Sequence, residues 1–296
     1  MKRNAGKLIQ KLGAVAVAGV LGAALLTGCG AQADNGAESA DSMDSVQKVV
    51  VGTTGLYALQ SFINEDGELD GAEIAVCKAI DEKLPQYEFE YSTMEFAAIL
   101  PAVDAGKVQI ACSNLRRTED RDANYIHSKE AYITSPYYII VLGDNTDING
   151  IDDLNGKKLG INEGSTQAGI LESYIEKSGA DIELVYSSDP VPDLVAGRID
   201  AIVDPQRYVL SLNSSYEDAQ FKTVGDPIDN LAEEGSVVAD YNAYLWFSPQ
   251  DTELRDAVDT ALAELYADGT LGEISKEYYG EDYAKDINRE YVESFQ

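Results

Sequence analysis

Apolar residues in the first part of the chain occur in short runs, with helical stripes between them. The apolar run at 49–51 and the mostly apolar segments 89–91 and 108–112 are typical of buried strands. The stretches 72–84 and 96–105 predict helices, because their apolar residues recur every three or four positions. Strands that alternate with helices in this way usually form a parallel sheet. The pattern therefore predicts a first α/β unit.

The same alternation is repeated in the second half of the chain. The predicted strands and helices of this half are, in order, 139–141, 159–161, 165–177, 183–185, 189–196, 199–203 and 205–212. A strand at 243–247 and a long amphipathic helix at 253–267 follow. Two similar α/β units in tandem indicate two lobes.

A chain that enters a second lobe and then returns must cross between the lobes twice. We place these crossings near 132–134 and 239–242. The expected fold class is α/β, with two Rossmann-like lobes joined by two hinge crossings and a ligand cleft between them. The first lobe would contain residues 46–132, the second lobe 133–240, and residues 241–296 would return to the first lobe with the C-terminal helices. Two hinge strands are typical of a clamp that closes around a ligand.

Three arginines follow one of the predicted strands closely: Arg116, Arg117 and Arg121. Ligands of open α/β sheets bind beyond the carboxyl ends of the strands. The planar guanidinium of Arg matches a carboxylate with two hydrogen bonds. Alternatively, these arginines only offset the acids within 119–122, which suits a solvent-facing Arg117 better than Arg121.

Other candidate ligand contacts also lie at strand ends and helix starts. Gly164, Ser165 and Thr166 begin a helix, where backbone N–H groups and the helix dipole attract a carboxylate. A simple Ser N-cap is compatible with this role. Tyr57 and Phe96 are placed to sandwich a ligand side chain, although both are equally explained as core aromatic residues.

Charge and composition argue against several classes of function. The formal net charge of −30 excludes a nucleic-acid reader, which needs a basic surface. The chain has a single histidine, His127, and none of the common hydrolase, metalloprotease or nucleotide-binding motifs. Cys77 and Cys112 can form a disulfide or remain as buried thiols, and they are too few for a metal site. We therefore expect neither an enzyme nor a cofactor nor a metal.

The N-terminal residues have the pattern of a secretory signal. Basic residues precede the apolar run 12–26, which is short for a membrane-spanning helix. The run ends in Leu-Thr-Gly before Cys29, which resembles a bacterial lipobox in which the cysteine is acylated. We predict a lipoprotein signal peptide at 1–28, lipidation of Cys29, and a disordered tether at 29–45, which has few large apolar residues.

The stretch that carries the arginines resembles a known family. Thr-Glu-Asp-Arg at 118–121, followed by His127-Ser128 and Tyr132, is similar to a signature of the family 3 extracellular solute-binding proteins. These are the amino-acid receptors of ABC importers. Further similar segments follow in the family's order along most of the chain, at 51–53, 68–71, 99–108, 154–158, 196–201 and 268–270.

The resemblance implies a fold and a set of ligand contacts. The fold would be that of type II periplasmic binding proteins. Tyr57 and Phe96 would pack on the ligand, and Arg121 with the Thr166 N–H would hold its α-carboxylate. Asn114 and Arg116 would line the same loop.

The chain departs from the family pattern at several positions, Thr54, Ala72, Ala75 and Gln109 among them. The most important departure concerns the acid that binds the α-ammonium, because Pro205 occupies its position and Asp204 comes one residue early. Either a β-bulge aims Asp204 inward, or the partner of the amine lies elsewhere.

The expected function is that of a substrate-binding lipoprotein of an ABC importer. It would act as a monomer on the outer face of the cell membrane, held there by its lipid. It would capture an amino acid or a related amino compound and deliver it to the permease and ATPase subunits. A ligand-sensing module for a membrane receptor is the alternative, and a lyase or dehydratase on the same scaffold is a weaker one.

Overall fold

The computed structural model describes residues 46–216, 218–232 and 236–287, all of them within one compact unit of the chain. The predicted signal peptide, Cys29 and the predicted tether lie outside these residues. Within the described ranges, no helix combines the length and the apolar character that crossing a membrane would require.

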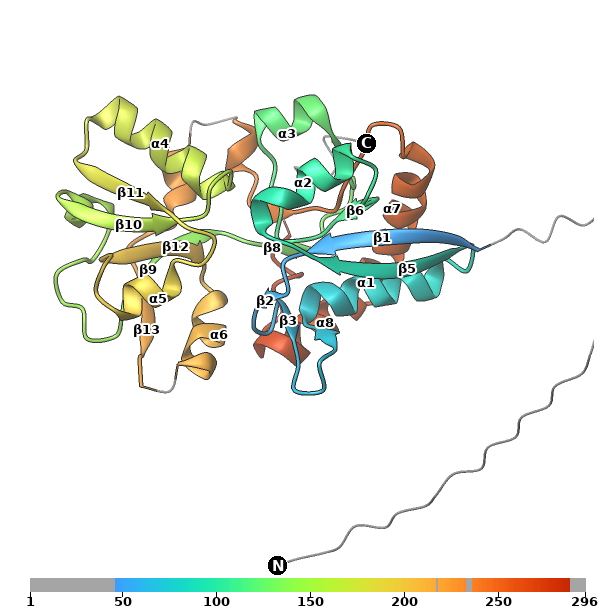
Figure 1. Ribbon diagram of the computed structural model, residues 1–296, viewed down its shortest axis with the longest axis horizontal. Helices are drawn as coiled ribbons and strands as arrows, with labels where there is room; N and C mark the ends of the chain where they lie inside the picture. Colours follow the sequence, from blue (N-terminus) through green and yellow to red (C-terminus); the bar gives the residue numbers. More distant parts are fainter. Residues whose placement is uncertain (1–45, 217, 233–235, 288–296) are drawn as a thin grey trace, which may run out of the picture. The chain divides into compact units, whose positions relative to one another are not determined.

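The first of two five-stranded sheets has the strand order β5-β1-β6-β15-β7 (Figure 1). Its strands are β1 (Gln47–Thr53), β5 (Tyr87–Thr93), β6 (Ile110–Ala111), β7 (Ile126–His127) and β15 (Trp246–Phe247). Strand β1 pairs in parallel with β5 and β6, as the helical connections predict. Strand β15 comes from the far end of the chain and pairs antiparallel with β6 and β7. Strand β15 thus joins the sheet that β1 and β6 begin.

Five helices accompany this first sheet, and the longer ones pack on it through an apolar face. They are α1 (Ala72–Lys83), α2 (Phe96–Asp104), α3 (Glu119–Asn124), α7 (Thr252–Ala267) and α8 (Thr270–Tyr279). In α7 the buried side chains include Leu254, Val258, Leu262 and Leu265, which recur every three or four positions. Full burial of such a side chain is worth about 1.5–3 kcal/mol, so the stripe fixes the helix on the core.

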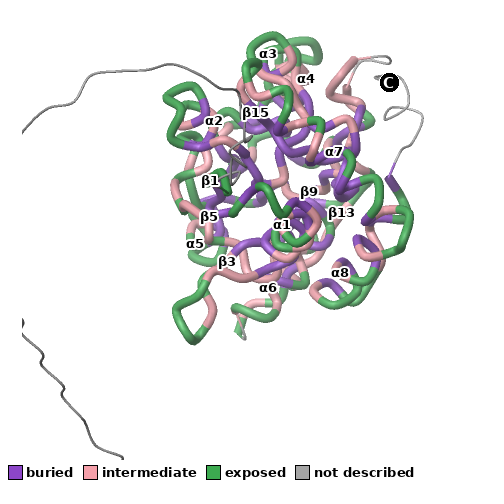
Figure 2. Tube along the Cα trace, turned by 90° about the vertical axis from the view of Figure 1, so that its right-hand side faces the viewer, coloured by how far each residue is buried: buried purple, intermediate pink, exposed green. Residues whose placement is uncertain are grey.

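The second sheet has the order β11-β10-β12-β9-β13. Its strands are β9 (Tyr137–Leu142), β10 (Lys157–Ile161), β11 (Ile182–Tyr186), β12 (Ala201–Pro205) and β13 (Phe221–Val224). Strand β10 pairs in parallel with β11 and β12, whereas β9 runs antiparallel to β12 and β13. Helices α4 (Thr166–Ser178), α5 (Val191–Val195) and α6 (Tyr208–Ser215) belong to this lobe. Figure 2 shows the buried residues gathered along strands such as β1, β9 and β15.

The two crossings lie side by side. Strand β8 (Ile133–Thr134) pairs antiparallel with β14 (Asn242–Ala243), within one residue of the two predicted positions. The crossings therefore form a two-stranded hinge between two sheet-bearing lobes, and the predicted fold class is confirmed. The residue boundaries proposed for the lobes remain a prediction.

Several elements differ from the sequence prediction. The strand expected at 243–247 is divided into β14 and β15, because the backbone N–H of Tyr244 turns to the carbonyl of Leu115. The helix expected from residue 205 begins at Tyr208, since β12 continues through Pro205 in its pairing with β9. The unpredicted elements are the hairpin strands β2 (Leu56–Tyr57), β3 (Ser61–Ile63) and β4 (Leu69–Asp70), helices α3 and α8, strands β7 and β13, and the 3-10 turns η1 (Ile151–Leu154), η2 (Ile228–Leu231) and η3 (Val237–Ala239).

Candidate functional site

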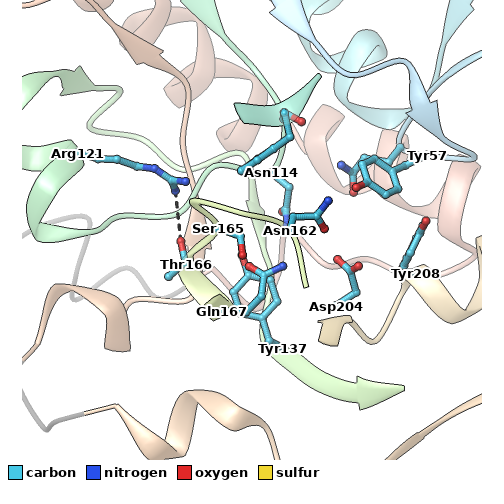
Figure 3. A pocket seen from close by; sticks show the side chains of 13 residues that line it. Tyr57, Asn114, Arg121, Tyr137, Asn162, Ser165, Thr166, Gln167, Asp204 and Tyr208 are labelled. Atoms are coloured by element: carbon cyan, nitrogen blue, oxygen red, sulfur yellow. Dashed lines mark hydrogen bonds between the residues drawn. The ribbon is translucent and has the colours of Figure 1, made fainter. Parts of the chain in front are cut away.

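A pocket of about 450 Å³ is lined by residues from both lobes (Figure 3). The lining residues are Tyr57, Gln60, Phe96, Ser113, Asn114, Arg121, Tyr137, Asn162, Ser165, Thr166, Gln167, Asp204 and Tyr208. Seven of the eight ligand-contact residues predicted from the sequence are in this set, and Arg116 is not.

Arg121 is the only basic residue of the pocket lining. It lies on α3, whose N-cap residue Thr118 accepts a hydrogen bond from the Arg121 backbone N–H at 3.1 Å. Its guanidinium donates from Nη1 to the Thr166 hydroxyl at 3.2 Å and from Nη2 to the Gly164 carbonyl at 3.0 Å. Both acceptors belong to the second lobe, so Arg121 reaches across the cleft, as the dashed line of Figure 3 shows for Thr166.

The start of α4 faces Arg121 from the second lobe. Ser165 caps the helix, with its hydroxyl accepting from the Ala168 N–H at 3.2 Å. An α-helix leaves its first N–H groups without intrahelical acceptors, and the helix dipole makes this end positive. Burial also lowers the pKa of Arg121 to about 10, so its cation lacks part of its hydration but persists at neutral pH. This end of the pocket therefore favours an anion.

Asp204 gives another part of the pocket the opposite charge. It lies on β12 opposite Tyr138, in a register that continues without interruption from Ile202 to Pro205. The β-bulge that one of the two alternatives required does not occur between these residues, and Asp204 reaches the pocket from a regular strand. Burial raises the pKa of its carboxyl to about 7, with Asp189 adding to the rise and Arg207 opposing it. A carboxylate held at such a cost is ready to bind a cation.

Two tyrosines meet across the cleft next to Asp204 (Figure 3). Tyr57 lies on β2 of the first lobe, and Tyr208 begins α6 of the second. Their ring centroids are 5.1 Å apart in an edge-to-face arrangement. Aromatic faces attract cations within about 6 Å, which adds to the preference of this end for an amine.

The two other arginines of the stretch have different roles. Arg116 is fully buried, forms an ion pair with Asp229, and donates to the carbonyls of Val238 at 2.8 Å and Asp240 at 3.2 Å. It thus fastens the returning crossing instead of lining the pocket. Arg117 pairs with Asp122, as the charge-compensation alternative predicted, but it is buried and does not face solvent.

The pocket also contains residues that the sequence reasoning missed: Gln60, Ser113, Tyr137, Asn162, Gln167 and Tyr208. Asn162 follows directly after strand β10, so the strand-end rule that selected Arg121 could have found it as well. Tyr208 carried no such signal, because its position depends on the turn after β12.

The histidine and the two described cysteines, residue types that often act in catalysis or metal binding, do not line the pocket. His127 packs against the rings of Tyr244 and Trp246, and burial lowers its pKa. Cys77 and Cys112 are both buried and are not joined in a disulfide. No group of three or more potential metal ligands occurs in the part of the chain that the structure describes.

Comparisons with known proteins identify the family of this chain. The model of the bacterial extracellular solute-binding proteins, family 3, matches residues 49–281. The chain belongs to this family. The L-cystine-binding protein TcyJ of Bacillus subtilis is 34% identical over 243 residues, which cover 81% of this chain and 86% of the relative. The L-cystine-binding protein TcyK of the same organism is 30% identical over 266 residues, covering 88% and 93%.

The fold of this solute-binding protein is similar to that of a solved structure. The putative L-cystine ABC transporter from Listeria monocytogenes superimposes with a TM-score of 0.73 at 30% identity, covering 82% of this chain and all of that one. This solute-binding protein is therefore a substrate-binding component of an ABC importer, and it acts outside the cytoplasmic membrane. Its family and relatives are substrate-binding proteins and not enzymes.

Proposed function

We propose that this solute-binding protein captures a zwitterionic α-amino acid in the pocket between its lobes and delivers it to an ABC permease. The observation that carries the proposal is that one pocket holds both Arg121 and Asp204. L-Cystine is the first candidate ligand, because the two relatives described above are named L-cystine-binding proteins.

Arg121 is proposed to bind the α-carboxylate. Arg121 is only 4% exposed. Its guanidinium donates to oxygens of Arg116, Thr166 and Gly164, none of which is a carboxylate. A carboxylate placed between Arg121 and the start of α4 would supply the charge compensation that burial removes. Charge-assisted hydrogen bonds of this kind are about twice as strong as neutral ones.

Asp204 is proposed to bind the α-ammonium. Its pKa of about 7 means that ionisation of the buried carboxyl is costly, and a ligand cation beside it would lower this cost. The rings of Tyr57 and Tyr208 border the same region and would complete the cation site. Charges of opposite sign within one pocket select a zwitterion over a simple acid or a simple amine.

The ligand side chain is proposed to lie among Tyr57, Phe96 and the polar groups of Asn114, Asn162 and Gln167. Aromatic rings supply apolar contact, and side-chain amides offer both donors and acceptors. Ser165 and Thr166 would contribute through the helix start. This mixture suits an amino acid whose side chain is partly polar.

Anchoring of this protein is proposed to depend on Cys29. The Leu-Thr-Gly-Cys sequence at residues 26–29 supports lipidation after removal of the signal peptide. Two acyl signals together give stable membrane attachment, whereas a single chain gives only marginal binding. The tether at 29–45 would then let the lobes reach the permease.

A thermal-shift panel tests the proposed ligand class. L-Cystine, L-cysteine, basic and neutral amino acids, simple amines and simple carboxylic acids are each added to the purified mature protein. A ligand at about 100 times its Kd stabilises the fold by about 2.7 kcal/mol, which is about 5–10 °C for a domain of this size. A shift with amino acids alone is expected. A panel in which simple amines or acids shift the melting temperature as much as any amino acid would refute the two-charge site.

A further inference from the structure

Arg207 crosses between the lobes in the direction opposite to Arg121. It lies between β12 and α6 in the second lobe and is 3% exposed. Its Nη1 donates to the Thr134 carbonyl at 3.1 Å and to the Ser135 hydroxyl at 3.0 Å, and its Nη2 donates to Asn114 Oδ1 at 2.7 Å. Its guanidinium also lies 5.5 Å from the centre of the Tyr279 ring. These partners belong to the hinge segment or to the first lobe.

Asn114 links this arginine to the pocket, which it helps to line. Its Oδ1 accepts from the Ser135 hydroxyl at 2.8 Å as well as from Arg207. Its backbone has a φ of +49°, a left-handed conformation that costs energy for residues other than glycine. Hydrogen bonds on both sides of the residue hold this conformation, because its backbone N–H also donates to the Tyr132 hydroxyl at 3.0 Å.

A buried acid of the first lobe completes the cluster. Glu73 is 2% exposed, and its Oε1 accepts from the Tyr132 hydroxyl at 2.7 Å and from the Asn114 N–H at 2.5 Å. Burial raises the pKa of Glu73, and the charge of Arg207 opposes this rise. Glu73 and Arg207 also line the same internal cavity, together with Tyr279. The first lobe thus places a buried acid close to the arginine of the second.

We propose that Arg207 is a positioning residue that fastens the closed form, by tying the pocket residue Asn114 to the hinge segment at 134–135. When the lobes separate, Arg207 cannot stay with the second lobe and also keep its bond to Asn114 of the first lobe. Asp204, on β12, lies three residues before Arg207, so a ligand held by Asp204 is coupled through the chain to the hinge. This inference rests on the proposed function, because it takes the pocket as the ligand site.

A fastening role differs measurably from a merely structural one. A residue that stabilises only the closed form slows ligand release and leaves the encounter rate unchanged, since affinity differences within one interface arise mostly in the dissociation rate. A residue that only supports the fold changes the melting temperature, but its loss does not raise the dissociation rate while leaving the association rate unchanged.

The experiment compares Arg207→Met and Arg207→Lys with the wild-type protein and with Arg117→Met. Arg117 is the matched control, because it is also a buried arginine but its ion pair with Asp122 stays within the first lobe. Asn114→Gly is a second test of the same bond, since glycine accepts the positive φ and removes the Oδ1 acceptor.

Two readouts are measured on each folded protein. The first is the association and dissociation rates of L-cystine by stopped flow. The second is the distance between spin labels on the exposed residues Lys107 and Glu176, one in each lobe, with and without L-cystine. We expect Arg207→Met to raise the dissociation rate about tenfold or more, with the association rate within about threefold. Arg207→Lys should recover part of this loss, because one ammonium cannot reproduce the planar fork.

The label distances should show more of the open form in Arg207→Met and Asn114→Gly than in the wild type, and Arg117→Met should match the wild type. The inference is overturned when Arg207→Met has wild-type rates and distances, or when Arg117→Met changes them equally. A wild-type protein that does not bind L-cystine would refute that ligand only, because the label distances without ligand still decide whether Arg207 favours the closed form.

Discussion

Lowering the pH from about 8 to about 6 should weaken ligand binding through the protonation of a single carboxyl group. Burial is the main cause that raises the pKa of the Asp204 carboxyl to about 7. The proposed ammonium contact requires the ionised form. About a tenth of the Asp204 carboxyls are ionised one unit below their pKa, so affinity at about pH 6 should be about tenfold lower than at pH 8.

The direction of this effect follows from proton linkage. The ligand binds the deprotonated carboxyl, so the complex releases a proton wherever the free protein still holds one. At about pH 7 the release should be about half a proton for each ligand bound. The same raised pKa means that folding stability falls as pH rises from the ordinary value of an aspartate toward about 7, because the folded state holds the proton more tightly.

Isothermal titration calorimetry in two buffers of different ionisation enthalpy measures both quantities. Asp204→Asn is the matched control, because it keeps the shape of the side chain and removes the titration. Its affinity should be lower at pH 8 and should not vary down to pH 6. A wild-type dissociation constant that is the same at both pH values, with no proton release, would refute Asp204 as the partner of the ammonium.

Three further outcomes are expected. In calorimetric titrations, Arg121→Ala should cost about 2–5 kcal/mol of binding free energy, which is about 30-fold to several thousand-fold in affinity. Arg121→Lys should recover part of this loss, and Arg117→Ala should weaken binding less than tenfold. Equal losses for the two alanine variants would place the carboxylate elsewhere. Cys29→Ala should move the protein from the membrane fraction to the soluble fraction with an unchanged melting temperature, and retention after a carbonate wash would exclude the lipid anchor. Saturating ligand should shorten the distance between labels on Lys107 and Glu176, and an unchanged distance would contradict a closing clamp.

The regular elements could be predicted from the sequence because their apolar pattern is local. Helix α7 shows a helical stripe, and strands β1 and β9 contain continuous apolar runs. The hairpin of β2, β3 and β4 was missed, since its strands are only two or three residues long and partly exposed. A short strand of this kind is defined by its pairing and carries little periodicity of its own.

The candidate site could be predicted where a local motif determines the contact. Thr118 caps α3 and thereby aims Arg121 into the cleft, so the motif and the geometry agree. Arg116 has the same chemistry and a similar position in the sequence, but its buried partner Asp229 is more than a hundred residues away. Such a partner becomes visible only when the second lobe is folded and placed next to the hinge.

The same limit explains the pocket residues that were missed. Gln60 and Tyr208 meet the pocket from opposite lobes, and no spacing along the chain brings them together. Asp204 stands where the sequence departs from the expected family pattern. The regular pairing of β12 with β9 then shows that no bulge is needed to bring Asp204 to the pocket.

Calorimetric titration with three matched compounds tests the two-charge site most directly: the amino acid that the wild type binds, the same molecule without its carboxylate, and the same molecule without its ammonium. We predict that Arg121→Ala weakens the amino acid and the acid but leaves the weak affinity for the amine unchanged. Asp204→Asn should weaken the amino acid and the amine but not the acid. If Arg121→Ala weakens the amine as much as the amino acid, then Arg121 supports the shape of the pocket and does not bind the carboxylate.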